Sequence, residues 1–239
     1  KLERLINNFK PNFVFNLAAV TTHEKCKKNP KATYEVNSFF PHKLALLCKK
    51  NKSFLIHFSS DVIFDGEKNK LYEVSDMPIP KTLQGQSIFY GENLVLSSTN
   101  SLIFRLPMLF GKFLEKKFIY KCLATINKNN YIYLCNDIYC SPINASDVAN
   151  YLLKNIFNKK KFKTLSKKRI IHLSTNKRIS RYQFIKDISY LIKKSKYVKK
   201  IKYKNLKLKI MPQRSLGIKS NVKNFISSDF KTYIDEINL

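Results

Sequence analysis

Short apolar runs alternate with helix-like stretches along the first half of the chain, and this alternation constrains the fold more than any other feature. Apolar runs of strand type occupy residues 12–20, 53–60 and 101–111. Segments with helical spacing separate them, one at 30–51 and one after Pro80. Strands that are buried on both faces read as continuous apolar runs, so the pattern predicts an α/β fold with a parallel sheet.

The second half of the chain has a less regular pattern. Residues 130–157 predict a short strand, a loop and a helix that is capped by Ser146 or Asp147. A further strand is expected at 169–176, and Ser180 is expected to open a late helix.

The charge of the chain is strongly unbalanced. Its 239 residues include 45 Lys and Arg against 16 Asp and Glu, which gives a formal net charge of +29. Only six of the basic residues are arginine. Nucleic-acid sites favour arginine for bidentate contacts, so this pattern argues against nucleic acid as the partner. Lysines become more frequent after residue 158. A surface that binds some polyanion therefore stays as an alternative.

The five cysteines are odd in number and show no CxxC spacing. We therefore expect reduced thiols in a cytoplasmic protein. Cys135 and Cys140 lie close together in the sequence, but no second cluster completes a zinc site, so no metal is predicted.

No apolar run approaches the roughly 20 residues that cross a bilayer, and no targeting leader opens the chain, so we expect no membrane span.

Seven phrases occur in an order that is typical of one superfamily. They are NLAAVTTHEKCKKNP, YEVNSFFPHKLA, FLIHFSSDVIFDG, GENLVL, RLPMLFG, SPINASDVA and IIHLSTN. Together they resemble the extended short-chain dehydrogenase/reductase superfamily, and in particular the dTDP-4-dehydrorhamnose reductase-like family with its RmlD-like substrate-binding domain. That family also includes the regulatory β subunit of methionine adenosyltransferase.

The resemblance implies a doubly wound Rossmann-type sheet that binds NADP or NAD, with a smaller C-terminal lobe for a nucleotide-sugar substrate. Residues 1–111 would form the Rossmann-type domain, which looks incomplete at its N-terminal end. Residues 112–239 would form mainly the substrate lobe, and 136–175 would return to the Rossmann-type domain.

The resemblance also assigns site residues. Ser60 matches the active-site Ser or Thr that hydrogen-bonds the substrate carbonyl. Five residues would line the cofactor: Ala18, Ala19, Thr21, Asn37 and Ser59. Three would face the substrate: Asp61, His23 and Arg214.

Most of these residues also have a plainer interpretation. Ala18, Ala19 and Thr21 could simply form a tight turn between a strand and a helix. Ser60 could be a strand-end hydroxyl that satisfies nearby backbone groups. Asn37 could face solvent on its helix, His23 could be a loop bystander, and Arg214 could simply be exposed. His57, which lies within an apolar strand, is expected to be a core residue with satisfied hydrogen bonds.

The sequence departs from the family pattern at the pair that does the acid chemistry. The family's YxxxK falls on Gln84 and Ile88. Residues at i and i+4 share a helix face, so the family's lysine cation lowers the pKa of the tyrosine, which then donates a proton to the carbonyl oxygen. We expect neither Tyr90 nor the distant Tyr182 and Lys186 to replace that pair.

A second departure is the glycine-rich phosphate loop. The five glycines form no GxxGxxG group, so we expect this chain to lack an N-terminal βαβ unit. In the expected strand order, the strand at 13–19 would then lack a neighbour and present a bare edge. We expect such a chain to be poorly soluble or to self-associate.

The sequence therefore predicts an NAD(P)H-dependent oxidoreductase of a nucleotide-linked 4-keto-6-deoxy sugar, in dTDP-rhamnose and polysaccharide biosynthesis. Its activity would be weak or lost because of Gln84 and Ile88. The alternative is a non-catalytic NAD(P)- or sugar-nucleotide-binding regulatory subunit, like the methionine adenosyltransferase β subunit. A homodimer or a regulated partner enzyme fits either case.

Overall fold

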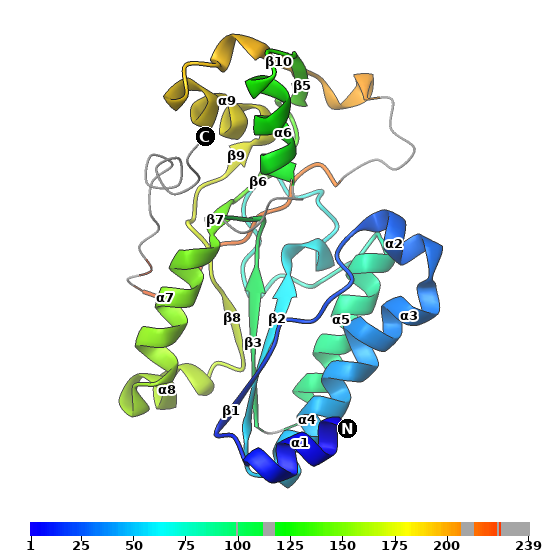
Figure 1. The fold of residues 1–239 in the computed structure, drawn as a ribbon, viewed down its shortest axis with the longest axis vertical. Helices are drawn as coiled ribbons and strands as arrows, with labels where there is room; N and C mark the ends of the chain where they lie inside the picture. The colour runs from blue at the N-terminus through cyan, green and yellow to red at the C-terminus, as the bar shows by residue number, and fades with distance from the viewer. Residues whose placement is uncertain (99, 112–117, 207–212, 224, 226–239) are drawn as a thin grey trace. The chain divides into compact units, whose positions relative to one another are not determined.

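Four parallel strands form one sheet in the order β1-β2-β3-β8 (Figure 1). They are β1 (Phe13–Asn16), β2 (Phe54–Ser60), β3 (Ser101–Leu106) and β8 (Ile170–His172). The register pairs Phe13 with Phe54 and runs on without a bulge through all four strands. The predicted α/β fold with a parallel sheet is confirmed. In this sheet β1 is an edge strand.

The computed structural model describes residues 1–98, 100–111, 118–206, 213–223 and 225. The chain splits into two compact units. The first unit holds the four-stranded sheet and comprises residues 1–65, 74–106 and 155–172. The second comprises 66–73, 107–154 and 173–239. The expected domain boundary at residue 111 and the return of 136–175 to the Rossmann-type domain stay predictions.

One face of the sheet packs against three helices of the first unit. These helices are α1 (Leu2–Phe9), α4 (Phe40–Lys50) and α5 (Leu83–Leu96). Successive side chains of a strand point to opposite faces, so Leu55 and Ile103 turn toward the helices while their neighbours turn away. The resulting core includes Ile6, Leu44, Leu47, Leu55, Val95 and Ile103.

The opposite face of the sheet is covered by α8 (Lys159–Ser166). The Phe162 ring lies edge-on to Phe13, with centroids 5.0 Å apart, and to Phe54 at 4.8 Å. Leu165, one turn further along α8, is also buried. Helices thus flank both faces of the sheet, as a doubly wound arrangement requires.

The single helix expected at 30–51 is divided into three parts. It comprises α3 (Pro30–Tyr34), a π-helical segment η1 (Glu35–Phe39) and α4. Asn29 caps α3 by accepting a hydrogen bond from the backbone N–H of Ala32, and Pro30 takes the first helical position, where it loses no backbone bond. Single-turn π segments inside α-helices often mark functional positions, and this one carries Asn37. A short helix, α2 (His23–Lys28), precedes it.

The second unit is built around α6 (Phe118–Asn127) and α9 (Arg181–Leu191). A parallel pair of strands, β5 (Ile132–Cys135) and β10 (Val198–Ile201), completes its core. The buried residues are Phe110, Ile119, Cys122, Leu123, Ile126, Phe184, Ile185, Ile188 and Val198. The C-terminal segment that carries Arg214 is described for residues 213–223 and 225.

Two further strand pairs belong to the second unit. One pair is parallel, β4 (Leu109–Phe110) with β7 (Ile143–Asn144). The other is antiparallel, β6 (Tyr139–Cys140) with β9 (Ile179–Ser180). The strand expected at 101–111 is therefore interrupted at Pro107. Three short 3₁₀ segments complete the described elements: η2 (Asp61–Ile63), η3 (Ser195–Tyr197) and η4 (Tyr203–Asn205).

One predicted helix cap is confirmed and one is wrong. Ser180 caps α9, because its hydroxyl accepts a hydrogen bond from the Gln183 N–H at 3.0 Å. The helix α7 (Ala145–Ile156) begins before Ser146, and the Asn144 Oδ1 accepts from the Ser146 N–H at 2.9 Å. The side chain of Asn144 therefore has the capping role expected of Ser146 or Asp147.

All five cysteines are buried, and none is part of a disulfide. Burial raises the pKa of the Cys48 thiol to about 11 and that of Cys122 to about 12, so both stay protonated at neutral pH. Within the described ranges, no helix is both long enough and apolar enough to cross a membrane, and no group of three or more His, Cys, Asp or Glu residues could hold a metal ion.

Candidate functional site

The C-terminal edge of the four-stranded sheet gathers most of the predicted site residues. Parallel strands all end at the same edge, where ligands of open α/β sheets bind. β1 ends at Asn16, and the segment that follows it carries Ala18, Ala19 and Thr21, all of which are exposed. β2 ends at Ser60 and passes directly into η2, which begins with Asp61.

Ser60 and Asp61 form a local hydrogen-bonded turn. The Ser60 hydroxyl donates to Asp61 Oδ1 at 3.1 Å and accepts from the Val62 N–H at 3.5 Å. These contacts match the plainer interpretation of Ser60, in which a hydroxyl at the end of a strand bonds to nearby groups of its own segment. Ser59 lies on the opposite face of β2, where its hydroxyl is buried and has no hydrogen-bond partner among the described residues. The roles of these residues toward a cofactor or substrate stay predictions.

Asn37 is buried and braces the segment that follows β1. Its exposed fraction is 3%, so the interpretation as a solvent-facing helical residue is wrong. Its Oδ1 accepts from the Val20 N–H at 2.8 Å, and its Nδ2 donates to the Val20 carbonyl at 3.1 Å and to the Ser87 hydroxyl at 3.0 Å. The oxygen and the nitrogen of the Asn37 amide both bond the loop at Val20, and the nitrogen also connects it to Ser87 of α5.

The helix α5 places Gln84 and Ile88 against the interior of the first unit. Thr82 caps it by accepting from the Gly85 N–H at 3.1 Å. A Cβ added to Gly85 would lie 2.3 Å from the Val62 carbonyl oxygen, so the first turn of α5 runs directly against the segment that follows Ser60. The backbone at the start of α5, next to Gln84, therefore contacts the backbone that follows Ser60.

The side chains at the family's acid pair have little of the required chemistry. Gln84 is 7% exposed and Ile88 is 6% exposed, and they lie one turn apart on α5. An amide donates a hydrogen bond but has no proton to transfer at neutral pH. Ile88 places an uncharged side chain where the family pattern has a lysine.

A buried ion pair holds α5 to the sheet, and sequence reasoning gave it no role. The Arg105 Nη2 lies 2.7 Å from Glu92 Oε2, and Arg105 Nε lies 2.9 Å from Oε1, so the contact is bidentate. Arg105 Nη1 also lies 3.4 Å from His172 Nε2, which links α5 through β3 to β8. A signal was available, because Glu92 and Arg105 belong to the GENLVL and RLPMLFG phrases.

His57 lies in the core beneath this helix layer, as predicted, but only one ring nitrogen has a partner. Asn16 Oδ1 accepts from the Ala18 N–H, which directs the Asn16 Nδ2 toward His57 Nδ1 at 3.1 Å. Nδ1 is therefore an acceptor, and Nε2 has no hydrogen-bond partner in the described part of the chain. Burial lowers the pKa of His57 to about 4.

The other predicted substrate residues are less informative. His23 opens α2 and is half-buried; burial and then the charge of Lys27 lower its pKa. Arg214 belongs to the second unit, is exposed, and lies with its guanidinium carbon 5.4 Å from the centre of the Tyr203 ring. The prediction that Arg214 faces a substrate stays untested.

The tyrosines considered as substitutes have other contacts. Tyr90 is 45% exposed, and its ring lies against Tyr34 and Phe39 on the outer side of α5. Tyr182 and Lys186 belong to α9 of the second unit, where the Lys186 ammonium donates to the Ser195 carbonyl at 2.7 Å. These contacts agree with the expectation that neither replaces the family's pair.

Comparison with known proteins agrees with the resemblance. The family model of the RmlD substrate binding domain matches residues 1–216. The chain is 29% identical to the dTDP-4-dehydrorhamnose reductase of Aggregatibacter actinomycetemcomitans over 151 residues, which are 63% of this chain and 51% of that protein. It is 27% identical to the methionine adenosyltransferase 2 subunit beta of Xenopus laevis over 189 residues, 76% of this chain and 55% of that protein.

Solved structures with the same fold include two dTDP-4-dehydrorhamnose reductases. The enzyme from Clostridium acetobutylicum gives a TM-score of 0.87 at 21% identity and covers 100% of this chain and 85% of its own. The enzyme from Bacillus anthracis, solved in complex with NADP, gives 0.84 at 17% identity and covers 99% and 83%. The matches to the two relatives above span only about half of each relative's own length.

The Asn37 brace generates a prediction about stability. Asn37→Asp keeps the shape but replaces the Nδ2 donor with a carboxylate oxygen that faces the Val20 carbonyl. We expect a loss of about 2–4 kcal/mol in the free energy of unfolding at pH 7, measured by urea titration, and a partial recovery at acid pH as the carboxyl protonates. The exposed Asn93→Asp is the matched control, expected within about 0.5 kcal/mol of wild type. Equal stability of the two variants would rule out the brace.

The His57 environment generates a prediction about pH. The folded pKa of His57, about 4, lies below the ordinary histidine value of 6.5, so protonation favours the unfolded chain. The stabilisation is complete above pH 6.5 and declines as the pH falls toward 4, by about 3 kcal/mol in total. Urea titrations from pH 7 to pH 4 should therefore show a steeper decline for wild type than for His57→Gln. Parallel declines would contradict the assignment, since other titrating groups are common to both proteins.

Proposed function

Because the chain belongs to the RmlD substrate binding domain family, we propose that it is an NAD(P)H-dependent reductase-family protein that acts on a nucleotide-linked 4-keto-6-deoxy sugar. The observation that carries the proposal is the contact between the start of α5 and the segment after Ser60. It brings the positions that the family uses for its hydroxyl and its acid to the same end of the sheet. The names of the relatives support the reductase class.

The end of β1 fits a nicotinamide cofactor. Ala18 and Ala19 carry the smallest side chains after glycine and are exposed, so a flat ligand can approach their backbone closely. Thr21 follows them on the same segment, which the Asn37 brace holds in place. We propose that these residues would hold the cofactor, which when bound supplies a hydride to the carbonyl carbon of the substrate.

The protein's own part in the reaction would be to orient the carbonyl. The Ser60 hydroxyl would turn its proton from Asp61 Oδ1 to the carbonyl oxygen, and the Gln84 amide would donate a second hydrogen bond. Neither side chain supplies the proton that must reach the oxygen as the hydride arrives, so that proton would come from solvent water. Loss of a general acid typically lowers the rate by a factor of about 10² to 10⁴, so we propose slow turnover.

The second candidate is a non-catalytic regulatory subunit that binds NAD(P) or a sugar nucleotide. Gln84 and Ile88 favour it, because they remove the acid chemistry and leave the segment at the end of β1 unchanged. The similarity to the Xenopus laevis protein, named as a subunit of methionine adenosyltransferase, also supports it. In this case the protein would act through a partner enzyme or as a homodimer.

Two further features belong to the proposal. Five buried thiols outside any disulfide fit the reducing cytoplasm, where the protein would work. The relative from Haloferax volcanii is named a probable low-salt glycan biosynthesis reductase and is 34% identical over 112 residues, 46% of this chain and 37% of that protein. We accordingly propose a role in polysaccharide synthesis, with dTDP-rhamnose as the candidate product.

The proposal predicts the effect of restoring the acid pair. We expect Gln84→Tyr/Ile88→Lys in the full-length protein to raise the rate of NADPH oxidation with dTDP-4-dehydrorhamnose at least 100-fold over wild type, measured by the fall in absorbance at the nicotinamide band. Gln86→Tyr/Tyr90→Lys introduces the same two side chains at the same spacing on the exposed side of α5 and should change nothing.

The possible outcomes separate the two candidates. Measurable wild-type turnover supports the reductase, whereas turnover only after restoration supports the regulatory subunit. A restored protein and a wild type that are both inactive, although folded and able to bind NADPH, would contradict the assigned substrate class.

A further inference from the structure

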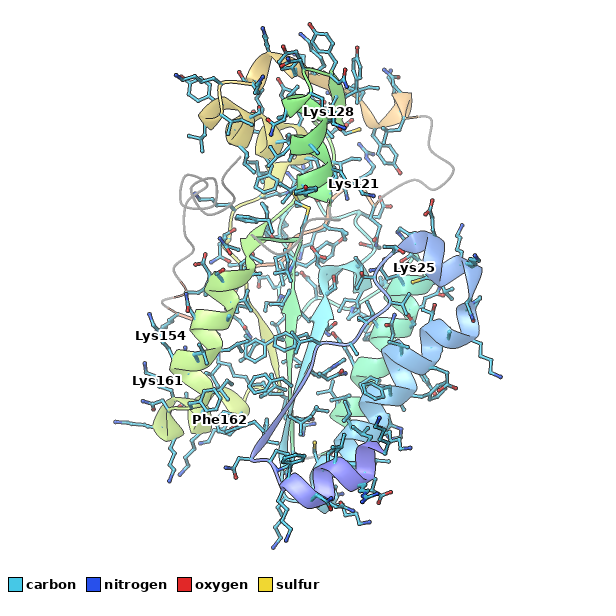
Figure 2. The ribbon with its side chains drawn as sticks, viewed as in Figure 1. Lys25, Lys121, Lys128, Lys154, Lys161 and Phe162 are labelled. Carbon is cyan, nitrogen blue, oxygen red and sulfur yellow. The ribbon has the colours of Figure 1, made fainter. Side chains whose placement is uncertain are left out.

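Exposed lysines are clustered along α8 and just after its end, on the first unit. We define the α8 surface by the exposed side chains Phe157, Lys159, Lys160, Lys161, Lys163 and Lys167. On the inward side of the same helix, Phe162 contacts the sheet (Figure 2), and Leu165 is buried. The lysines therefore belong to a helix that the core of the unit holds in place, and each of them is exposed.

Within the part of the chain that the structure describes, the charge of this surface is not balanced by ion pairs with carboxylates. The sequence contains no Asp or Glu from Val148 to Lys186. Among the described residues, no acidic side chain forms an ion pair with a lysine of the α8 surface. Like charges at neighbouring positions of a helix destabilise it slightly, so the cluster gains from an external anion.

The α8 surface lies at the N-terminal edge of the sheet. Phe162 contacts Phe13 and Phe54, which are the first residues of β1 and β2. The exposed Lys10 and Lys52 precede these strands closely and extend the positive charge along the same edge. The candidate site lies at the opposite, C-terminal edge, so a partner on the α8 surface leaves that site open.

The chemistry of the surface favours lipid headgroups. Its cations are all lysines, which act as point charges toward phosphates and lack the bidentate fork that reads bases. Phe157, at the start of the surface, is 61% exposed and provides an apolar side chain beside the charges. Clustered lysines with a neighbouring exposed aromatic side chain are typical of peripheral binding to anionic membranes.

We propose that the α8 surface attaches the protein to the surface of a membrane that contains anionic lipids. The lysines neutralise headgroup phosphates, and Phe157 enters the interfacial region. The attachment is peripheral, and it depends on electrostatics and on salt concentration. It requires neither cofactor nor substrate, so it is independent of the proposed reductase activity.

The test is sedimentation of the full-length protein with vesicles of phosphatidylcholine and phosphatidylserine in a 7:3 ratio, compared with phosphatidylcholine alone. We expect saturable binding to the mixed vesicles only, weakened by added salt. Lys160→Gln/Lys161→Gln/Lys163→Gln should lower the partition coefficient by about fivefold per lysine, or about 100-fold in all.

The matched control is Lys25→Gln/Lys28→Gln/Lys31→Gln, which removes the same charge from exposed lysines of α2 and α3; these helices follow β1 at the opposite end of the sheet of the same unit. It should lower the partition coefficient by less than about fivefold, because charges beyond a Debye length of about 8 Å contribute little. Phe157→Ser should weaken vesicle binding at least threefold without changing the salt dependence. Urea titrations of all variants confirm that they are folded.

Three results would overturn the proposal. The first is equal binding to neutral and anionic vesicles. The second is an equal loss in the two triple variants, which would mean that net charge acts without a defined surface. The third is tight, salt-dependent binding to generic RNA by a protein that ignores vesicles, which would identify a nucleic acid as the partner.

Discussion

The ion pair between Glu92 and Arg105 is the contact on which the geometry of the first unit depends. Both side chains are almost completely buried, and removing one partner of such a pair typically destabilises a protein by about 3–5 kcal/mol. The pair fixes α5 to β3, and His172 extends the link to β8. Gly85 and Gly91 then allow backbone contact with Val62 and Asn37, so α5 has little freedom to slide. The positions of Gln84 and Ile88 follow from these contacts.

These contacts form a frame that holds the binding segments of the site in place independently of the residues at the acid pair. The segment after β1 is held by Asn37, and the turn at Ser60 is held by its own hydrogen bonds, without any contribution from the side chains of Gln84 and Ile88. Replacement of a Tyr–Lys pair by Gln and Ile can therefore leave the frame intact. In the family pattern the Tyr–Lys pair serves the acid chemistry. Glu92, Arg105 and Asn37 of this chain instead hold helix, strand and loop together.

The sequence predicted the parts of the structure that depend on periodicity and missed those that depend on tertiary contacts. Strands near 13–16, 54–60 and 101–106 follow from apolar runs, and the cap at Ser180 follows from local chemistry. The π-helical turn was not predictable, because it arises where Asn37 reaches across to Val20. The role of Asn144 at the start of α7 was missed because Ser146 and Asp147, which follow it closely, are also residues that cap helices. The predicted roles of the site residues rest on resemblance and await measurement.

The most direct test of the account is whether cofactor binding survives without the acid pair. NADPH titrated into the full-length wild-type protein and into Gln84→Tyr/Ile88→Lys, with nicotinamide fluorescence as the readout, reports binding independently of turnover. The account predicts saturable one-site binding to both proteins with dissociation constants within about threefold, a difference of less than about 0.7 kcal/mol. Absence of saturable binding in both, or binding that appears only in the variant, would contradict the claim that the frame of the site is intact.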